Sequence, residues 1–300
     1  MLNFEKEQKV VEIDKVKMGG QPGENPPVMI GTVFYSSHSA LLDEKTGKVD
    51  KSILEKELNE FVQVIEDTGM QGIIDIVGGY PEALLKECEY ISELVDYPFL
   101  VDGLNDQSRI PAMEGLKDIG LLNRAILNSI DEATDETNLE KLKEIGVKYA
   151  VLLTFGTRYI FPHQKLKFLK EILIPKTEKA NIKDYIVVTA VLDLPSIGIN
   201  FETVNLIKRE LGVPVGFAPA NAIYNWEFVK SYGDAARCGA IAAQMAYCIN
   251  AGSDFVLFGP IKFAKCVIPA ISLIAGINSY YRKRILRKKV AEKNPLTKIF

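Results

Sequence analysis

The sequence predicts a single (β/α)8 TIM barrel, the α/β fold in which eight parallel strands alternate with helices. Eight short apolar runs alternate with stretches whose apolar residues recur every three or four positions, and this alternation is typical of a parallel sheet covered by helices. Four of the runs end at or beside Asp75, Asp102, Asn128 and Thr154, which are spaced by 26 or 27 residues. A near-constant step indicates repeated strand–helix units, and eight such units close a barrel.

The predicted strands and helices follow from the same pattern. The strands are expected at residues 28–35, 72–77, 98–102, 124–129, 149–155, 185–193, 213–218 and 254–259. The helices are expected at residues 51–68, 81–95, 135–145, 164–175, 201–211, 233–250 and 262–289. An open, doubly wound sheet is the alternative, but no GxGxxG or P-loop motif follows the first strand to favour it.

The N-terminal segment is expected to stand apart from these repeats. Residues 9–19 contain two short apolar runs around Asp14 and Lys15, which predict a small hairpin. The Gly- and Pro-rich stretch at 19–27 predicts turns. We therefore expect a hairpin and turn in residues 1–27, within one domain over residues 1–300, because no low-complexity linker interrupts the chain.

Composition places the chain among ordinary globular proteins. Of its 300 residues, 47% are hydrophobic and 25% are charged, which suits one large core. The net charge of −3 gives no general polyanion-binding surface, so nucleic acid is not an expected partner. The charged N-terminus lacks a signal-peptide core, and the uncharged run 266–281 is short for a membrane span. We expect a cytoplasmic protein without a membrane span, in which 266–281 is a buried helix.

The cysteines and histidines give no metal-binding pattern. Cys88, Cys238, Cys248 and Cys266 form no CxxC pair, and neither histidine lies near them in the sequence. We therefore expect reduced, buried thiols and no metal site in this chain. The basic stretch 282–293 is interpreted as a solvated helix end, and the alternative is a docking surface for an acidic partner.

Polar residues at the strand ends indicate a ligand site at one mouth of the barrel. Buried carboxylates and amides are costly unless they are paired or solvated, although strand-end residues of this kind often cap the next helix instead. The candidates are Asp75, Asp102, Asn105, Asn128, Asp193 and Asn221. Because none of them is cationic, a phosphate ligand is a poor match. A flat ring with a guanidine-like edge, such as a pterin, fits carboxylates and amides better.

Several longer motifs resemble one protein family across essentially the whole chain, in the same order. They are VKMGGQPGENPPVMIGTVFYSSH at 16–38, DIVGGYPEAL at 75–84, PFLVDGLNDQSRI at 98–110, AILNSI at 125–130, TAVLDLPSIG at 189–198, VPVGFAPANAIYNW at 213–226, LFGPI at 257–261 and NPLTKIF at 294–300. The chain resembles the H subunit of tetrahydromethanopterin S-methyltransferase and its soluble relatives, the corrinoid protein:tetrahydrofolate methyltransferases.

The resemblance implies a pterin-binding barrel, usually a homodimer, that moves a methyl group between a methyl-Co(III) corrinoid protein and N5 of a tetrahydropterin. The pterin is tetrahydrofolate or tetrahydromethanopterin. The corrinoid, a cobalamin-type group, comes on a partner protein, because this chain has no corrinoid-binding DxHxxG motif. By position, Asn221 matches the catalytic amide that reaches N5. The pterin-binding candidates are Asp75, Asp102, Asn105, Asn128 and Asp193.

Two other functions are alternatives, and one departure from the family keeps the first of them open. Val188 stands where the relatives carry an Asp, which removes one expected pterin-facing carboxylate. One alternative is a non-catalytic pterin-binding or scaffolding subunit of a methyltransferase complex. The other is a condensing enzyme similar to dihydropteroate synthase, which needs arginine near the strand ends. For the corrinoid partner, the candidate contact loops are 155–161 and 218–226, where Tyr224 and Trp226 are either interface anchors or core aromatics.

Overall fold

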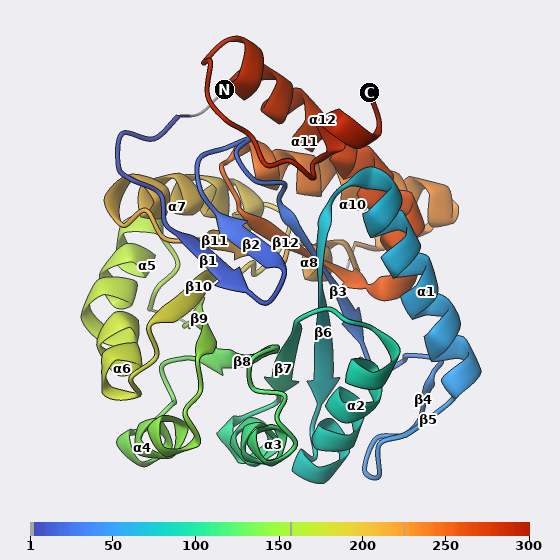
Figure 1. Ribbon diagram of the computed structural model, residues 1–300, viewed down its shortest axis with the longest axis vertical. Helices are drawn as coiled ribbons and strands as arrows, with labels where there is room; N and C mark the ends of the chain where they lie inside the picture. The colour runs from blue at the N-terminus through green and yellow to red at the C-terminus, as the bar shows by residue number, and fades with distance from the viewer. Residues whose placement is uncertain (1–2, 157, 225) are drawn as a thin grey trace.

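The computed structural model describes residues 3–156, 158–224 and 226–300, apart from the side chain of Asn221. Eight parallel strands form a closed barrel in the spatial order β10-β11-β12-β3-β6-β7-β8-β9, with helices around it (Figure 1). The barrel strands are β3 (Val28–Val33), β6 (Gln71–Gly78), β7 (Phe99–Gly103), β8 (Ala125–Ile130), β9 (Tyr149–Thr154), β10 (Asp184–Thr189), β11 (Val215–Phe217) and β12 (Phe255–Pro260). The predicted (β/α)8 barrel is confirmed, and each strand overlaps its predicted range.

Most of the helices also lie where the sequence predicts them. They are α1 (Lys51–Thr68), α2 (Pro81–Leu94), α3 (Asp106–Asp118), α4 (Glu136–Ile145), α5 (Pro162–Phe168), a π-helical turn (Leu169–Leu173), α6 (Ile174–Lys179), α7 (Ser196–Glu210), α8 (Ala220–Tyr224), α9 (Glu227–Lys230), α10 (Gly233–Asn250), α11 (Ala264–Arg284) and α12 (Pro295–Lys298). The prediction lacked α3, because Pro111 and Gly115 interrupt its apolar pattern. Helix α11 ends short of the predicted residue 289, because the chain turns there and the Leu286 amide donates to the Tyr281 carbonyl.

The predicted N-terminal hairpin closes the end of the barrel at which the parallel strands begin, its amino-terminal end. Strands β1 (Val10–Ile13) and β2 (Val16–Gly19) pair antiparallel and lie across that end (Figure 1). A second small hairpin, β4 (Leu41–Asp43) with β5 (Lys48–Val49), follows β3 and was not predicted. The first hairpin shares one buried cluster with the barrel interior, which includes Val11, Ile13, Val16, Met18, Ile30, Ile73, Leu100 and Ile126. This apolar plug fills the interior of the barrel at that end, so the barrel interior is left open to a ligand at the opposite mouth, where the strands end.

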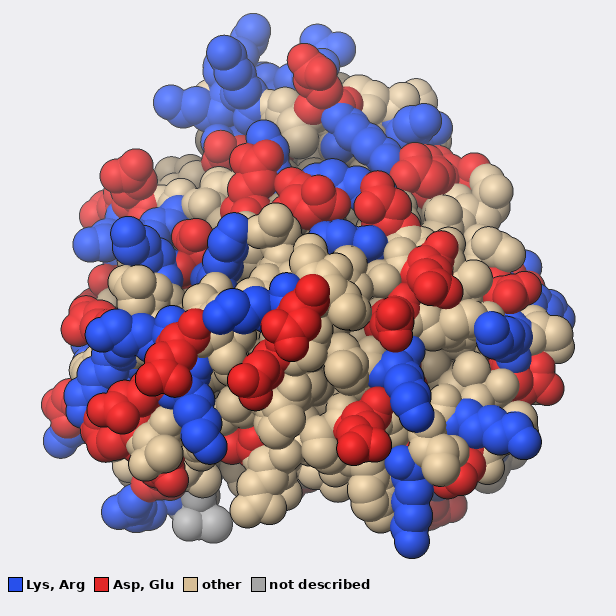
Figure 2. Space-filling model, turned by 60° about the horizontal axis from the view of Figure 1, so that its bottom comes forward, with Lys and Arg blue, Asp and Glu red and all other residues tan. Residues whose placement is uncertain are grey.

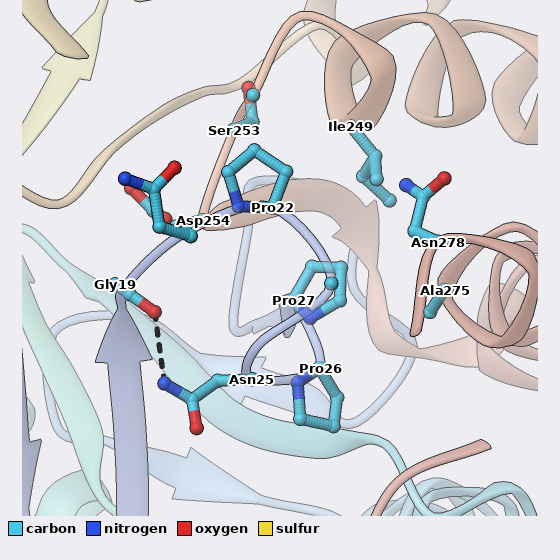
Figure 3. Close-up of a pocket in the computed structure, with 13 residues that line it drawn as sticks. Gly19, Pro22, Asn25, Pro26, Pro27, Ile249, Ser253, Asp254, Ala275 and Asn278 are labelled. Carbon is cyan, nitrogen blue, oxygen red and sulfur yellow. Dashed lines mark hydrogen bonds between the residues drawn. The ribbon is translucent and has the colours of Figure 1, made fainter. Parts of the chain in front are cut away.

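The Gly- and Pro-rich stretch after the hairpin lies at the same amino-terminal end of the barrel, against α10 and α11 (Figure 3). It borders a cavity of only about 20 Å³. Asn25 Nδ2 donates to the Gly19 carbonyl oxygen at 3.0 Å. Gly23 has a φ of +78° and lies so close to α11 that a Cβ there would come within 2.5 Å of the Asn278 carbonyl oxygen. This GGQPGE segment therefore braces the fold and lies away from the mouth.

A buried ion pair ties the same loop to the barrel. Lys208 on α7 is fully buried, and its Nζ donates to Asp254 Oδ1 at 2.8 Å and to the Gly20 carbonyl oxygen at 3.0 Å. Asp254 Oδ2 also accepts a hydrogen bond from the Val215 amide at 2.9 Å. Because these partners are buried together, removing the ammonium would leave an uncompensated carboxylate.

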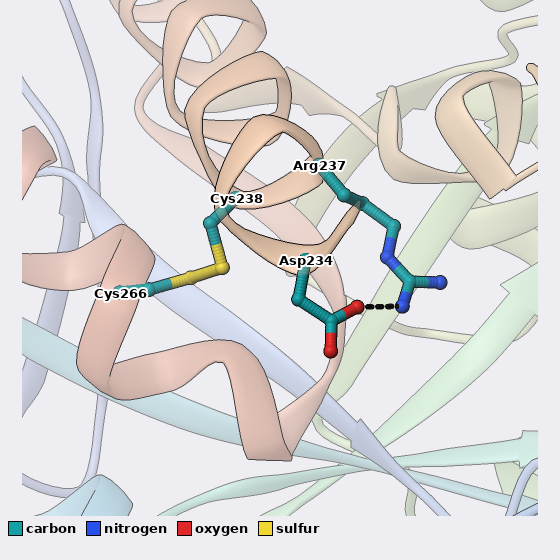
Figure 4. Close-up of a disulfide and its surroundings, with 4 residues drawn as sticks. All are labelled: Asp234, Arg237, Cys238 and Cys266. Atoms are coloured by element: carbon teal, nitrogen blue, oxygen red, sulfur yellow. Dashed lines mark hydrogen bonds and ion pairs between the residues drawn. A yellow bond between two sulfur atoms is a disulfide. The ribbon is translucent and has the colours of Figure 1, made fainter. Parts of the chain in front are cut away.

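The expectation that all four cysteines are reduced is wrong for one pair. Cys238 on α10 and Cys266 on α11 form a disulfide, with their Cα atoms 6.0 Å apart (Figure 4). The two helices pack against each other, a long-range contact that cysteine spacing does not reveal. Cys88 and Cys248 are free and buried, as predicted, and burial raises the pKa of both thiols.

Helix α11 accounts for the long uncharged run. The segment Ile261–Arg284 is long and apolar enough to cross a membrane, but 56% of its most apolar window is buried inside the fold, as expected of a core helix. Two basic residues at or beyond its end are paired, Arg282 with Glu24 at 2.9 Å and Lys293 with Glu66 at 2.7 Å. Lys and Arg side chains gather at the upper edge of Figure 2 and elsewhere alternate with Asp and Glu. These pairs favour the solvated interpretation of the basic stretch.

We expect Lys208→Met to lower the free energy of unfolding by about 3–5 kcal/mol, the usual cost of removing one partner of a buried ion pair. Lys170→Met is the matched control, because Lys170 pairs with Glu210 at 3.1 Å on the surface, and an exposed pair contributes less than about 1 kcal/mol. Urea unfolding followed by circular dichroism measures both variants. Equal losses would contradict a structural role for the buried pair.

For protein unfolded in denaturant without reductant, we expect thiol titration to detect Cys88 and Cys248 alone. After reduction, Cys238 and Cys266 should react as well. A crosslink between residues separated by 28 positions stabilises by about 3–4 kcal/mol in the chain-entropy description, so the reduced protein should unfold at a lower urea concentration. Finding all four thiols reactive before reduction would contradict the disulfide.

Candidate functional site

A cavity of about 490 Å³ opens at the carboxyl-terminal mouth of the barrel. Three predicted site residues line it together: Asp75 on β6, Asp102 on β7 and Asn128 on β8. Alternate side chains of a strand share a face, so Asp75 points inward above the core residue Ile73. The strand register pairs Asp102 with Asn128. The structure therefore brings these three residues to one hollow, which we call the main cavity.

Asp75 is buried with part of its hydrogen-bonding capacity unused. Its Oδ2 accepts a hydrogen bond from Thr32 Oγ1 at 2.8 Å, whereas Oδ1 has no partner among the described residues. Burial raises the pKa of Asp75 to about 6, against the lowering effect of Thr32 and Asn128. A buried acceptor without a donor lowers the stability of the folded protein. Asp75 borders the main cavity, where a bound ligand can donate a hydrogen bond to Oδ1.

The Asp102 carboxyl lies near Asp75 in the same cavity and is affected by its charge. Burial raises the pKa of Asp102 well above its ordinary value, the neighbouring Asp75 raises it further, and Arg109 lowers it. Two carboxyl groups this close do not ionise independently, and they favour holding a proton between them. A ligand that offers N–H groups to this pair would stabilise the ionised carboxylates.

The wall opposite these acids is mostly apolar. It includes Leu153 on β9, Val188 on β10 and Leu257 on β12. Val188 is the position at which the family resemblance leads us to expect an Asp, and it does border the main cavity. The cavity therefore offers hydrogen-bonding groups on one side and apolar side chains on the other, an arrangement that suits a ring with a polar edge.

Asn105 and Asp193 lie outside the main cavity and bond to helix amides instead. Asn105 Oδ1 accepts a hydrogen bond from the Ser108 amide at 3.2 Å, at the start of α3. Asp193 Oδ1 accepts one from the Ser196 amide at 2.9 Å, at the start of α7. Both side chains are exposed. The structure does not bring them together with the other three candidates, and it shows for both the helix-capping role that the sequence also allowed.

The predicted catalytic residue, Asn221, belongs to helix α8 at the mouth. Its neighbour Ala220 lines the main cavity, so the backbone of α8 borders the site. The side chain of Asn221 lies outside the described part of the structure. Its role as the catalytic amide stays a prediction.

Arg109, a cation that was not among the predicted site residues, also lines the main cavity. Its guanidinium donates to Asp106 Oδ1 at 2.8 Å, to Asp131 Oδ2 at 3.1 Å and to Ser129 Oγ at 3.4 Å. Two carboxylates thus neutralise it, which counts against a phosphate site of the dihydropteroate synthase type. Its sequence position could have pointed to the mouth. Arg109 lies in the first turn of the helix that follows β7, and helical side chains lean toward the N-terminal end of their helix, which here is the end nearest the mouth.

The FYSSH motif forms a turn beside the main cavity. His38 is buried, its Nδ1 accepts a hydrogen bond from the Phe34 amide at 3.0 Å, and its Nε2 lies 2.7 Å from Glu57 Oε2. These bonds hold the turn so that Tyr35 borders the mouth. Burial, followed by the charge of Glu57, raises the pKa of Tyr35 to about 12. His38 therefore has a structural role here.

The fold and the site define a TIM barrel with an acid- and amide-lined ligand cavity at its carboxyl-terminal mouth. Within residues 3–156, 158–224 and 226–300, no group of three or more His, Cys, Asp or Glu side chains is arranged to hold a metal ion. A ring that donates hydrogen bonds from one edge matches this cavity better than an anion does.

Comparison with known families gives the particular relationship. The family described as "Tetrahydromethanopterin S-methyltransferase MtrH subunit" matches residues 6–290. The chain is 33% identical over 284 residues to the H subunit of this enzyme from Methanothermobacter thermautotrophicus, covering 91% of this chain and 92% of that one. It is 30% identical over 321 residues to the H subunit from Methanococcus maripaludis, covering 100% of both. The chain belongs to the MtrH family of tetrahydromethanopterin S-methyltransferase subunits.

Solved structures share the barrel at much lower identity. Dihydropteroate synthase from Xanthomonas albilineans superposes with a TM-score of 0.58 at 15% identity, covering 90% of this chain and 98% of that one. A truncated 3-deoxy-D-arabino-heptulosonate 7-phosphate synthase from Thermotoga maritima gives 0.54 at 13% identity, covering 95% and 96%. These similarities establish the fold alone, since one barrel hosts many chemistries.

We expect Asp75→Asn to stabilise the ligand-free protein at pH 8 by about 1–3 kcal/mol, because folding raises the pKa of this carboxyl. The pKa of this carboxyl is about 4 in the unfolded chain and about 6 in the folded protein. In the wild type, the protonated carboxyl therefore contributes its full stabilisation below about pH 4, and this stabilisation is lost as the pH rises through about 6. The amide cannot ionise, so the variant avoids this loss. Urea unfolding at pH 5 and pH 8 measures the difference.

Asp193→Asn is the matched control for this measurement, because Asp193 is an exposed cap and an asparagine still caps. It should show no gain that depends on pH. If Asp75→Asn is no more stable than the wild type at pH 8, ionisation of the buried Asp75 carboxyl does not destabilise the folded protein.

Proposed function

We propose that this protein transfers a methyl group between a methyl-Co(III) corrinoid, carried by a partner protein, and N5 of a tetrahydropterin bound in the main cavity. The pterin is tetrahydromethanopterin, which the relatives' name specifies, or tetrahydrofolate. The observation that carries the proposal is the meeting of Asp75, Asp102 and Asn128 in one cavity, in a chain of the MtrH family.

The main cavity offers acceptors where a pterin offers donors. The 2-amino group and N3–H of a pterin form a guanidine-like edge that can donate two parallel hydrogen bonds to one carboxylate. Asp102 is the proposed acceptor of both, and the unpartnered Oδ1 of Asp75 can take a further N–H. The Asn128 amide can serve the ring's mixed donors and acceptors. The apolar wall beside Val188 accommodates the face of the ring.

The proposed reaction is attack by the N5 lone pair on the cobalt-bound methyl group. The N–C bond forms as the Co–C bond breaks, the bonding electron pair stays on cobalt as Co(I), and N5 releases its proton. The corrinoid supplies the electronic properties of the methyl donor. The contribution of this chain is to hold N5 in line with the methyl carbon at about 3–3.5 Å, with Asn221 as the proposed group that orients N5.

A corrinoid partner needs a docking surface around the mouth. The proposed contact loops are 155–161 and 218–226, of which residues 157 and 225 lie outside the described structure. Within and beside them, Trp226 is half-buried and stacks on Phe228 with ring centroids 5.5 Å apart. The strand-end loops expose large apolar side chains, each more than half exposed, namely Leu104, Phe155, Phe161, Leu192, Phe228 and Tyr232. This apolar rim supports docking of another protein over the mouth.

A homodimer in the cytoplasm is the proposed setting for this activity. Leu273, Ile277 and Tyr280 form an exposed apolar stripe on α11, at the spacing that places side chains on one helix face, and this stripe supports self-association. The second candidate function is a non-catalytic pterin-binding subunit of a methyltransferase complex. The apolar Val188 in the cavity wall favours it, because one pterin-facing carboxylate is replaced.

We expect the protein, mixed anaerobically with a methylated corrinoid partner and a tetrahydropterin, to generate Co(I). The absorbance of Co(I) measures this reaction.

Asp102→Asn should raise the Kd of the pterin about 10- to 100-fold, because a hydrogen bond to a charged group contributes about 1.5–3 kcal/mol. Calorimetry measures this Kd. Asp193→Asn, which lies outside the cavity, should bind as the wild type does.

Each outcome of this experiment separates the candidates. Pterin binding without formation of Co(I) would favour the non-catalytic subunit. Absence of binding by both tetrahydrofolate and tetrahydromethanopterin would overturn the assignment of the cavity. Light scattering of the same preparation tests the proposed homodimer.

A further inference from the structure

A second cavity of about 350 Å³ adjoins the main cavity at the mouth, and we call it the side pocket. Its own walls include Tyr224 on α8, Arg237 on α10 and Lys262 directly after β12. The two cavities share wall residues, namely Thr32, Tyr35 and Gly259. A ligand that fills the main cavity can therefore extend into the side pocket.

The side pocket has the opposite charge to the main cavity. The Arg237 guanidinium lies 5.3 Å and the Lys262 ammonium 5.7 Å from the centre of the same Phe263 ring, and all three residues line the side pocket. Arg237 pairs with Asp234 (Figure 4), a side chain that is 81% exposed. Lys262 forms no ion pair with any residue that the structure describes. Two positive charges on the wall of one pocket favour the binding of an anion in it.

The side pocket also contains a buried hydroxyl without a partner. Tyr224 Oη is buried and forms no hydrogen bond with the described residues. Burial, followed by the nearby Tyr35, raises the pKa of Tyr224, and Arg237 lowers it, which places the two rings and the guanidinium close together. The carboxylate of Glu57 next to Tyr35 is already engaged by His38. A buried donor without an acceptor indicates a ligand that supplies one.

A disulfide constrains the backbone that carries the two cations. Cys238 follows Arg237 on α10, and its disulfide to Cys266 joins that turn to the segment that begins with Lys262 (Figure 4). In Figure 4 the Arg237 side chain extends away from the disulfide toward Asp234. This crosslink limits the backbone freedom that the pocket wall can lose when an anion binds.

We propose that the side pocket binds the anionic tail of the reduced pterin while the ring occupies the main cavity. This inference rests on the proposed function and names the part of the substrate that selects it. The N–H-rich ring faces Asp75 and Asp102, and the carboxylate or phosphate groups of the tail face Arg237 and Lys262, with a hydrogen bond from Tyr224. Tetrahydrofolate ends in glutamate carboxylates and tetrahydromethanopterin also carries a phosphate, so both tails share the required charge.

The test compares tetrahydrofolate with 6-methyltetrahydropterin, which has the ring without the tail, by anaerobic calorimetry. Lys262→Gln should raise the Kd of tetrahydrofolate about twofold to fivefold, the range expected for a partly exposed ion pair, and leave that of 6-methyltetrahydropterin unchanged. Lys265→Gln is the matched control, because Lys265 pairs with Glu60 at 2.9 Å outside the pocket. Higher ionic strength should reduce the advantage of the tailed pterin, because salt screens exposed charges.

Arg237→Gln and Tyr224→Phe provide independent tests with the same two ligands, and each should weaken the tailed pterin selectively. A third arm with tetrahydromethanopterin distinguishes the two tails, since a larger loss for this ligand would indicate a phosphate contact. If the variants affect the tailed and tail-less pterins equally, or affect neither, the inference is overturned and the proposed function stands. If the wild type does not bind 6-methyltetrahydropterin, the proposed function fails and the inference fails with it.

Discussion

Closure of eight parallel strands into a barrel is the constraint on which the rest of this structure depends. Closure directs the carboxyl end of every strand to the same mouth, and the N-terminal hairpin fills the opposite end with apolar side chains. The polar layer that holds Thr32, Asp75, Asp102 and Asn128 therefore has one opening, through a mouth lined by the strand-end loops. Whatever binds to these groups enters from that side.

The electrostatic cost of this polar layer explains why it is suited to a ligand. Asp75 and Asp102 are desolvated next to each other, and the pKa of both is raised. A protein selected for stability alone would replace them, so their presence indicates stability given up for binding. The neighbouring cation, Arg109, is turned to Asp106 and Asp131. The two acids at the barrel centre are thus left for an incoming N–H donor.

The separation of charge across the mouth adds a direction to the site. Carboxyl groups line the main cavity, whereas Arg237 and Lys262 line the adjoining side pocket. A ligand with hydrogen-bond donors at one end and negative charge at the other fits both halves in only one orientation. The apolar rim, with Phe161 and Phe228 among its exposed side chains, stays available for a second protein above the bound ring.

The sequence by itself determined the features that depend on neighbours along the chain. Alternating strand and helix patterns predicted eight strands and placed α1 at 51–68, and the strand-end positions predicted Asp75, Asp102 and Asn128 as a group. These predictions succeeded because periodicity is local, and because barrel closure turns a repeated strand end into a shared position.

Only the tertiary structure decided the features that depend on which segments meet. Asn105 and Asp193 look like the other candidates in sequence, yet the orientation of the following helix makes them caps. The disulfide arises from the packing of α10 against α11. The side pocket forms where α8 and α10 meet the ends of β3 and β12 and the turn that follows each strand. Both features join residues that are distant along the chain. Local patterns carry no record of such contacts, because the packing of the whole barrel sets the distance between two helices.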